Sequence, residues 1–106
     1  MPTGTVGILS IELWLPGAQS LKDKRMVVRS VKDQLARRVG ASVSEVDHHD
    51  LWQRARITIA CVARVDGDAG RLLDDAERWL LGQPAFELTR RDRALVRLED
   101  VHEGLA

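Results

Sequence analysis

Cysteine is almost absent from this sequence. Cys61 is the only one in 106 residues, so the chain can form no internal disulfide bond and has no CxxC pair of metal ligands. Aromatic residues are also scarce, at three tryptophans, one phenylalanine and no tyrosine. These shortages exclude a disulfide-stapled secreted domain and a cysteine-based zinc module.

Long apolar runs are missing as well. No stretch approaches the roughly 18 apolar residues that a bilayer-spanning helix needs. The first ten residues, MPTGTVGILS, lack the basic and apolar segments of a secretory signal. We therefore expect a cytoplasmic protein with no membrane partner.

Charge of either sign is not in excess, but it is unevenly distributed. Sixteen basic residues balance sixteen acidic ones over the whole chain. Between residues 20 and 39, however, seven basic residues oppose two acidic ones, and between residues 66 and 81 five acidic residues oppose two basic ones. Local charge, rather than net charge, is therefore the guide to partners.

The first half of the chain predicts a strand, a helix and a second strand. In residues 5–15 the apolar side chains recur at every second position, which is typical of a strand with one buried face. Ser20 is a good N-cap and Gly40 a good stop for a helix between them. Residues 41–48 are more polar, which favours a strand at the edge of a sheet.

The second half predicts a strand, a helix and a last strand. Residues 54–65 alternate like a central strand, and the apolar stripe from Ala69 to Leu80 predicts a helix in which Trp79 belongs to the core. The last strand begins after Pro84. Its apolar residues are separated by even numbers of positions, which predicts that they share one face of the strand. They are Phe86, Leu88, Ala94, Val96 and Leu98.

The charged middle of the last strand, TRRDR, predicts a bulge or an exposed edge there. We expect residues 101–106 to form a tail. The order βαββαβ predicts a ferredoxin-like α+β sandwich in one domain over residues 1–106, with two helices on one face of a four-stranded antiparallel sheet.

The other face of the predicted sheet is left open. Apolar side chains on it are too many to remain wet over four strands, so we predict a homodimer that buries this face. The residues expected at that interface are Ile8, Trp14, Arg56, Thr58 and Val62.

The segment EVDHHDLWQR, residues 45–54, holds the densest group of chemically capable side chains. Neighbouring residues on a strand point to opposite faces, so His48 and His49 meet at one metal ion only if the chain turns between them. In the simpler interpretation, Asp50 forms an Asx-type turn while Leu51 and Trp52 anchor the connection against the core. We predict no metal and no cofactor here.

No catalytic constellation is visible elsewhere, and we predict that the protein is not an enzyme. The segment GDAG lacks the spacing of a phosphate-binding loop. Cys61 lies in the core phase of its strand. The central strands carry no aromatic residue except Trp14, so nucleobase stacking on the sheet is not expected.

A basic stripe on the first helix is the better candidate for a nucleic-acid contact. Lys22, Arg25, Arg29 and Lys32 recur at helical spacing, and Lys24 would widen the stripe. Such a stripe tracks phosphates without reading bases, and the acidic second helix would orient the nucleic acid by repulsion. An ordinary solvated helix face is the alternative.

Two segments carry a resemblance to a known family. LPGAQSLKDKR, residues 15–25, and VSEVDHHDLWQRA, residues 43–55, are similar to the YlxP-like proteins, a small bacterial family of unknown function. The similarity extends over nearly the whole chain and implies a ferredoxin-like fold without an established reaction. Members often lie beside genes of transcription termination and translation initiation, which implies RNA metabolism by association alone.

The resemblance also singles out a motif at the turn between the second and third strands. Its residues are Asp47, His48, Asp50, Leu51, Trp52, Gln53 and Arg54. A turn explains Asp50, Leu51 and Trp52, but it gives no reason for Gln53 and Arg54.

Three functional hypotheses follow. The first is a non-enzymatic factor that associates with RNA or the ribosome through the first helix. The second is a homo-oligomeric interaction module that uses the open sheet face. The third is a small-ligand or metal site at the motif turn.

Overall fold

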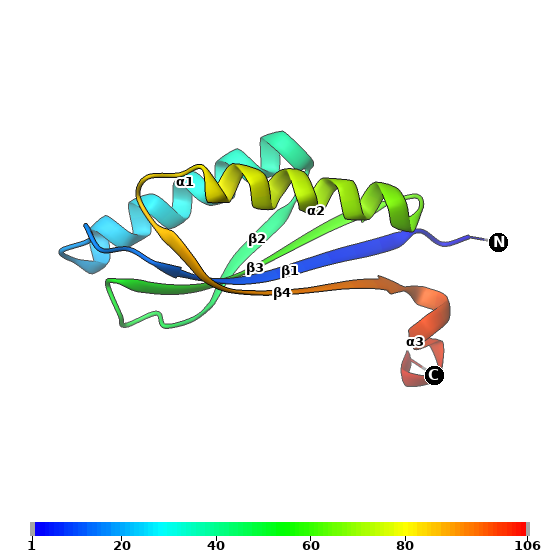
Figure 1. The fold of residues 1–106 in the computed structure, drawn as a ribbon. Coiled ribbons are helices and arrows are strands. Elements are labelled where there is room, and N and C mark those ends of the chain that lie inside the picture. Colours follow the sequence, from blue (N-terminus) through cyan, green and yellow to red (C-terminus); the bar gives the residue numbers. More distant parts are fainter. Residues whose placement is uncertain (1, 106) are drawn as a thin grey trace.

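Two helices pack on one face of a four-stranded antiparallel sheet, as Figure 1 shows. The computed structural model describes the backbone of residues 2–105 and the side chains of residues 2–101. The sheet order is β2-β3-β1-β4, which confirms the predicted ferredoxin-like topology. The elements in chain order are β1 (Thr5–Trp14), α1 (Leu21–Val39), β2 (Ser42–Asp47), β3 (Arg54–Ala63), α2 (Asp66–Leu81), β4 (Glu87–Arg97) and α3 (Leu98–Leu105).

The core lies between the sheet and the two long helices. Alternate residues of β1 and β3 point towards the helices, and each buried leucine or isoleucine contributes about 1.5–3 kcal/mol to folding. The largest fully buried apolar side chains are Leu9, Ile11, Leu13, Leu15, Val31, Leu35, Ile57, Ile59, Leu73 and Leu80. Trp79 is less central than predicted, because it is half-buried and the Arg38 guanidinium lies 5.5 Å from its ring centroid.

Both predicted ends of α1 are confirmed. The Ser20 side chain accepts a hydrogen bond from the backbone N–H of Asp23 at 3.0 Å, and it satisfies one of the free amides of the first turn. Gly40 adopts a left-handed conformation with φ 65°, from which its N–H reaches back to the Ala36 carbonyl at 3.1 Å. The helix is thereby fixed from Leu21 to Val39, over the β2 side of the sheet.

The predicted bulge is present in β4 and it changes the phase of the strand. Leu13 pairs with Leu88 and Glu12 pairs with Arg90, so Thr89 is the extra residue. Leu88 therefore packs against the core, whereas Ala94 pairs with Ile8 of β1 and lies on the open face. Our prediction of one apolar phase through the strand is wrong, because the bulge exchanges its two faces.

Of the expected tail at residues 101–106, the part up to residue 105 is helical. Residues 98–105 form α3, which projects from the end of β4 on the side of the sheet opposite α1 and α2 (Figure 1). Residue 106 lies outside the described residues. Within the described part, none of the helices combines the length and apolar character that crossing a membrane requires.

Candidate functional site

A buried lysine holds the connection between β2 and β3. Lys24 of α1 has only 1% of its side chain exposed. Its ammonium donates to three backbone carbonyls around the connection, those of His48 at 2.7 Å, His49 at 3.3 Å and Arg54 at 3.2 Å. The prediction that Lys24 widens a phosphate-binding stripe is therefore wrong, because all three of its donors point inwards.

Glu45 of β2 supplies the counter-charge for this lysine. Its Oε2 lies 2.9 Å from Lys24 Nζ, yet it receives no well-aligned hydrogen bond. These two facts are compatible, because the three N–H groups of an ammonium are already directed at carbonyls. The attraction is ionic, and it pairs a buried cation with a partly buried anion.

Gln53 ties the same connection to the loop between β1 and α1. Its side-chain amide donates to the backbone carbonyls of Pro16 and Ala18, both at 3.3 Å, and the backbone carbonyl of Gln53 accepts from the Leu15 N–H at 2.9 Å. This residue had no explanation in the sequence. It joins the two family segments, residues 15–25 and 43–55, into one structural unit.

His48 makes the turn, and its side chain reaches across the open face of the sheet. Its backbone φ of 65° is left-handed, which is uncommon for a residue with a side chain. Its Nε2 lies 3.0 Å from the carboxylate of Glu12, which also pairs with Arg54 at 3.3 Å. The hydrogen bond from His48, then the nearby arginines, hold the pKa of Glu12 below its usual value although partial burial opposes this. Arg54 is thereby explained as a partner of Glu12.

The side chains of the motif turn do not converge on a point where they could bind one metal ion. Its two imidazoles face different partners, because His48 meets Glu12 while His49 Nε2 lies 3.1 Å from the Glu45 carbonyl. Across the part of the chain that the structure describes, there is no group of three or more His, Cys, Asp or Glu side chains that could hold a metal ion.

Leu51 and Trp52 lie at the tip of the connection and do not anchor it. Their side chains are 46% and 52% exposed, so the predicted packing against the core is wrong. The anchoring is polar instead, through Lys24 and Gln53. Sequence reasoning missed this because a lysine four residues after an N-cap usually faces water.

The basic stripe of α1 is exposed as predicted. Lys22, Arg25, Arg29 and Lys32 all lie on the surface. Of the carboxylates in the described residues, none lies within ion-pair distance of these four side chains. Arg25, Arg29 and Lys32 also line one shallow hollow together with Glu45, which places them along the side of α1 that faces β2.

The open face of the sheet has a polar middle. The Ser10 and Thr58 hydroxyls are 2.9 Å apart, and Arg56 donates to Ser10 at 2.9 Å and to Asp92 at 2.8 Å. The hydrogen bond from Arg56 is the main cause of the lowered pKa of Asp92. Of the predicted interface residues, Arg56 and Thr58 are thus already engaged within the chain.

One half of the open face is apolar. Val62 pairs with Val6, which pairs with Val96, and the neighbouring row is Ala60, Ile8 and Ala94. Val62 is 74% exposed. The predicted interface residue Trp14 lies at the other end of β1, beyond the polar middle, so the five predicted residues do not form one continuous apolar surface.

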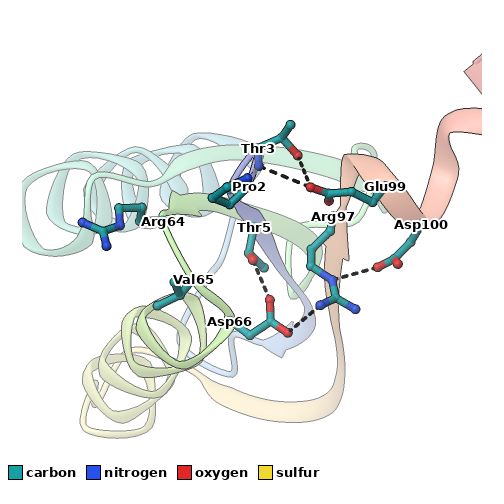
Figure 2. Close-up of a pocket in the computed structure, with 10 residues that line it drawn as sticks. Pro2, Thr3, Thr5, Arg64, Val65, Asp66, Arg97, Glu99 and Asp100 are labelled. Carbon is teal, nitrogen blue, oxygen red and sulfur yellow. Dashed lines mark hydrogen bonds and ion pairs between the residues drawn. The ribbon is translucent and has the colours of Figure 1, made fainter.

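A hollow of about 450 Å³ lies where β1 begins and where α2 and α3 start (Figure 2). Its polar groups pair with one another. Thr5 Oγ1 donates to Asp66 at 2.6 Å, Arg97 donates to Asp100 at 3.1 Å, and Arg64 points away from these groups in Figure 2. The hollow therefore offers no convergent donors or acceptors to a ligand.

A known sequence family matches most of the chain. The sequence pattern of the family described as "Protein of unknown function (DUF503)" matches residues 6–93. The chain belongs to the DUF503 family. The "Uncharacterized protein YlxP" of Bacillus subtilis (strain 168) is 33% identical over 58 residues, which are 55% of this chain and 63% of that protein. The match thus spans less than two thirds of the relative, and it confirms the YlxP-like resemblance.

Two solved structures resemble this fold loosely. The de novo designed protein Ferredog-Diesel is 14% identical, with coverage of 85% of this chain and 86% of that chain and a TM-score of 0.42. A REP-associated tyrosine transposase bound to a REP hairpin is 13% identical, with coverage of 98% and 63% and a TM-score of 0.42. At such low sequence identity and TM-score, neither protein gives information about the function of this chain.

Proposed function

We propose that this member of the DUF503 family is a non-enzymatic cytoplasmic factor that binds RNA, free or in the ribosome, through the basic stripe of α1. The stripe consists of Lys22, Arg25, Arg29 and Lys32. The observation that supports the proposal is that these four exposed cations have no acidic partner among the described residues. Exposed cations in a row neutralise phosphates and release counterions, which gives affinity without reading sequence.

The geometry of α1 suits a phosphate backbone. From Lys22 to Lys32 the helix rises about 15 Å, at roughly 1.5 Å per residue. The stripe runs beside the buried residues Val28, Val31 and Leu35, along the side of α1 that faces β2. The binding should therefore be weakly sequence-specific and strongly dependent on salt.

The test is a titration of structured RNA, ribosomal RNA for choice, over a salt series. We compare the wild type with Arg25→Glu/Arg29→Glu, and with the matched control Arg71→Glu/Arg78→Glu, whose exposed arginines lie on α2. The stripe variant should lose affinity at low salt, and its salt slope should fall by about two. The control should bind like the wild type. Equal affinity of both variants would end the proposal.

A second candidate function is self-association through the apolar half of the open face. The observation that favours it is the six-residue apolar surface on three adjacent strands, with Val62 at its most exposed point. A second copy could bury this surface by two-fold symmetry. Analytical ultracentrifugation should show a dimer in the wild type that dissociates in Val62→Glu, and a monomeric wild type at micromolar concentration would dismiss it.

A further inference from the structure

The tip of the β2–β3 connection combines a fixed backbone with exposed apolar side chains. Lys24 and Gln53 hold the backbone on both sides of the tip through hydrogen bonds. Leu51 and Trp52 between them are nevertheless about half exposed. A tryptophan gains most from burial, so a rigid turn that holds one outward leaves its ring available to a ligand.

The tip and the start of the basic stripe lie at the same end of the molecule. Lys24, which clamps the tip, stands in the sequence next to Arg25 of the stripe. Arg25, Arg29 and Lys32 share a hollow with Glu45 of β2, and β2 runs directly into the turn. Figure 1 shows the β2–β3 connection and the start of α1 together at the end of the molecule opposite the two termini.

We propose that Trp52 stacks on an unpaired nucleobase of single-stranded RNA whose phosphates lie along the basic stripe. This inference rests on the proposed function and names the form of RNA that is bound. A single strand is favoured because its bases are free to stack, whereas the bases of a duplex are already stacked on each other. Leu51 extends the apolar surface beside the ring.

The four cations without carboxylate partners favour RNA over a protein partner at this tip. An apolar hot spot on a protein surface needs no row of cations beside it, while a nucleic acid needs both a charge-neutralising track and a stacking platform. The platform here is on a turn, so it differs from the aromatic sheet surface that the sequence excludes.

The experiment measures binding of a single-stranded oligouridylate and of a blunt RNA duplex of equal charge. Trp52→Leu should lose roughly tenfold in affinity for the single strand, with its salt slope unchanged, because stacking is lost and phosphate contacts are kept. Its affinity for the duplex should stay the same. Trp52→Phe should restore much of the loss.

Trp14→Leu is the matched control, because it removes another exposed tryptophan, 42% exposed, that ends β1 on the open face. It should bind the single strand like the wild type. Thermal unfolding of each variant should stay close to that of the wild type, since leucine keeps an apolar side chain at each of these half-exposed positions.

The outcomes separate the two proposals. If Trp52→Leu binds the single strand as tightly as the wild type while Arg25→Glu/Arg29→Glu does not, stacking is refuted and the basic stripe stands. If the wild type binds neither RNA at low salt, both proposals fall. If Trp52→Leu instead changes the sedimentation coefficient at equal RNA affinity, the tip is a contact between copies and stacking is again refuted.

Discussion

The two long helices differ in how many of their charged side chains form ion pairs within the described residues. Each of the five acidic residues of α2 has an arginine partner, and the pairs are Asp66–Arg97, Asp68–Arg71, Asp74–Arg93, Asp75–Arg78 and Glu77–Arg91. Among the seven basic residues of α1, only Lys24 forms an ion pair within the described residues. Charge on α2 is therefore used within the fold, whereas most charge on α1 is left for solvent or a partner.

This comparison changes one expectation about nucleic acid. The acidic second helix was expected to orient a bound phosphate backbone by repulsion. Arg91, Arg93 and Arg97 of β4 point to the helix side of the sheet and pair with its acids. The field around α2 is accordingly weaker than the sequence alone suggests, and α1 dominates recognition in our proposal.

The largest effect should come from the one α1 cation that the fold does use. Lys24→Met removes a buried charge, and it leaves three carbonyls without their donor and Glu45 without its counter-charge. We expect a loss of about 3 kcal/mol in the free energy of unfolding, measured with urea. Lys22→Met, on the exposed side of the same helix, is the control and should change stability by less than about 0.5 kcal/mol. Similar losses of stability in the two variants would show that the buried contacts of Lys24 add no more stability than an exposed lysine of the same helix.

The carboxylate of Glu12 should contribute a smaller, pH-dependent effect. Its folded pKa is lowered, so its stabilisation is present above the unfolded value of about 4.3 and is lost as pH falls through the folded value. Glu12→Gln should be less stable than the wild type by about 1 kcal/mol at pH 7. The difference should shrink as acid is added, in urea unfolding curves recorded over pH. A difference independent of pH would argue against an ionised Glu12 bonded to His48.

A still smaller effect is expected where α2 meets β4. Arg93 donates to Asp74 at 2.7 Å and lies 3.5 Å from Glu77, and both pairs are partly in water. A double-mutant cycle with Arg93→Ala and Asp74→Ala should give a coupling of about 0.5 kcal/mol that declines with salt. No measurable coupling at low salt would mean that this ion pair contributes as little to stability as the basic stripe of α1.

The smallest effect on stability is expected in the basic stripe. Arg25→Gln/Arg29→Gln removes two cations without carboxylate partners in the described residues, so the free energy of unfolding should change by less than about 0.5 kcal/mol. The same variant should bind RNA more weakly than the wild type. A clear loss of stability in urea unfolding would show that these arginines belong to the fold.

The fold was predictable because its signals are local. Alternating apolar residues in β1, the N-cap Ser20 and the stop at Gly40 each act within a few residues, and all three are confirmed. The phase of β4 was not predictable, because a bulge moves it by one residue and only pairing with β1 reveals which residue is extra. α3 was missed because its sequence begins directly after the strand, without a turn residue.

The candidate site was predictable only in part. The exposed stripe on α1 follows from helical spacing. The roles of Lys24 and Gln53 could not be predicted. Both side chains donate to backbone carbonyls of segments far away in the chain, and every residue type has such a carbonyl, so the sequence does not indicate which ones are used. Trp52 was assigned to the core on the general preference of aromatic residues for burial, and the polar anchoring of the turn overrides that preference here.

The arginines of β4 have a consequence for how copies of the protein can meet. β4 is an 11-residue edge strand that pairs with a neighbour on one side only, and such an edge is a ready template for adding strands from other chains. Its bulge at Thr89 and its alternating charges discourage continuous strand addition. The protein should therefore resist forming fibrils, and any dimer should stack face against face rather than extend the sheet.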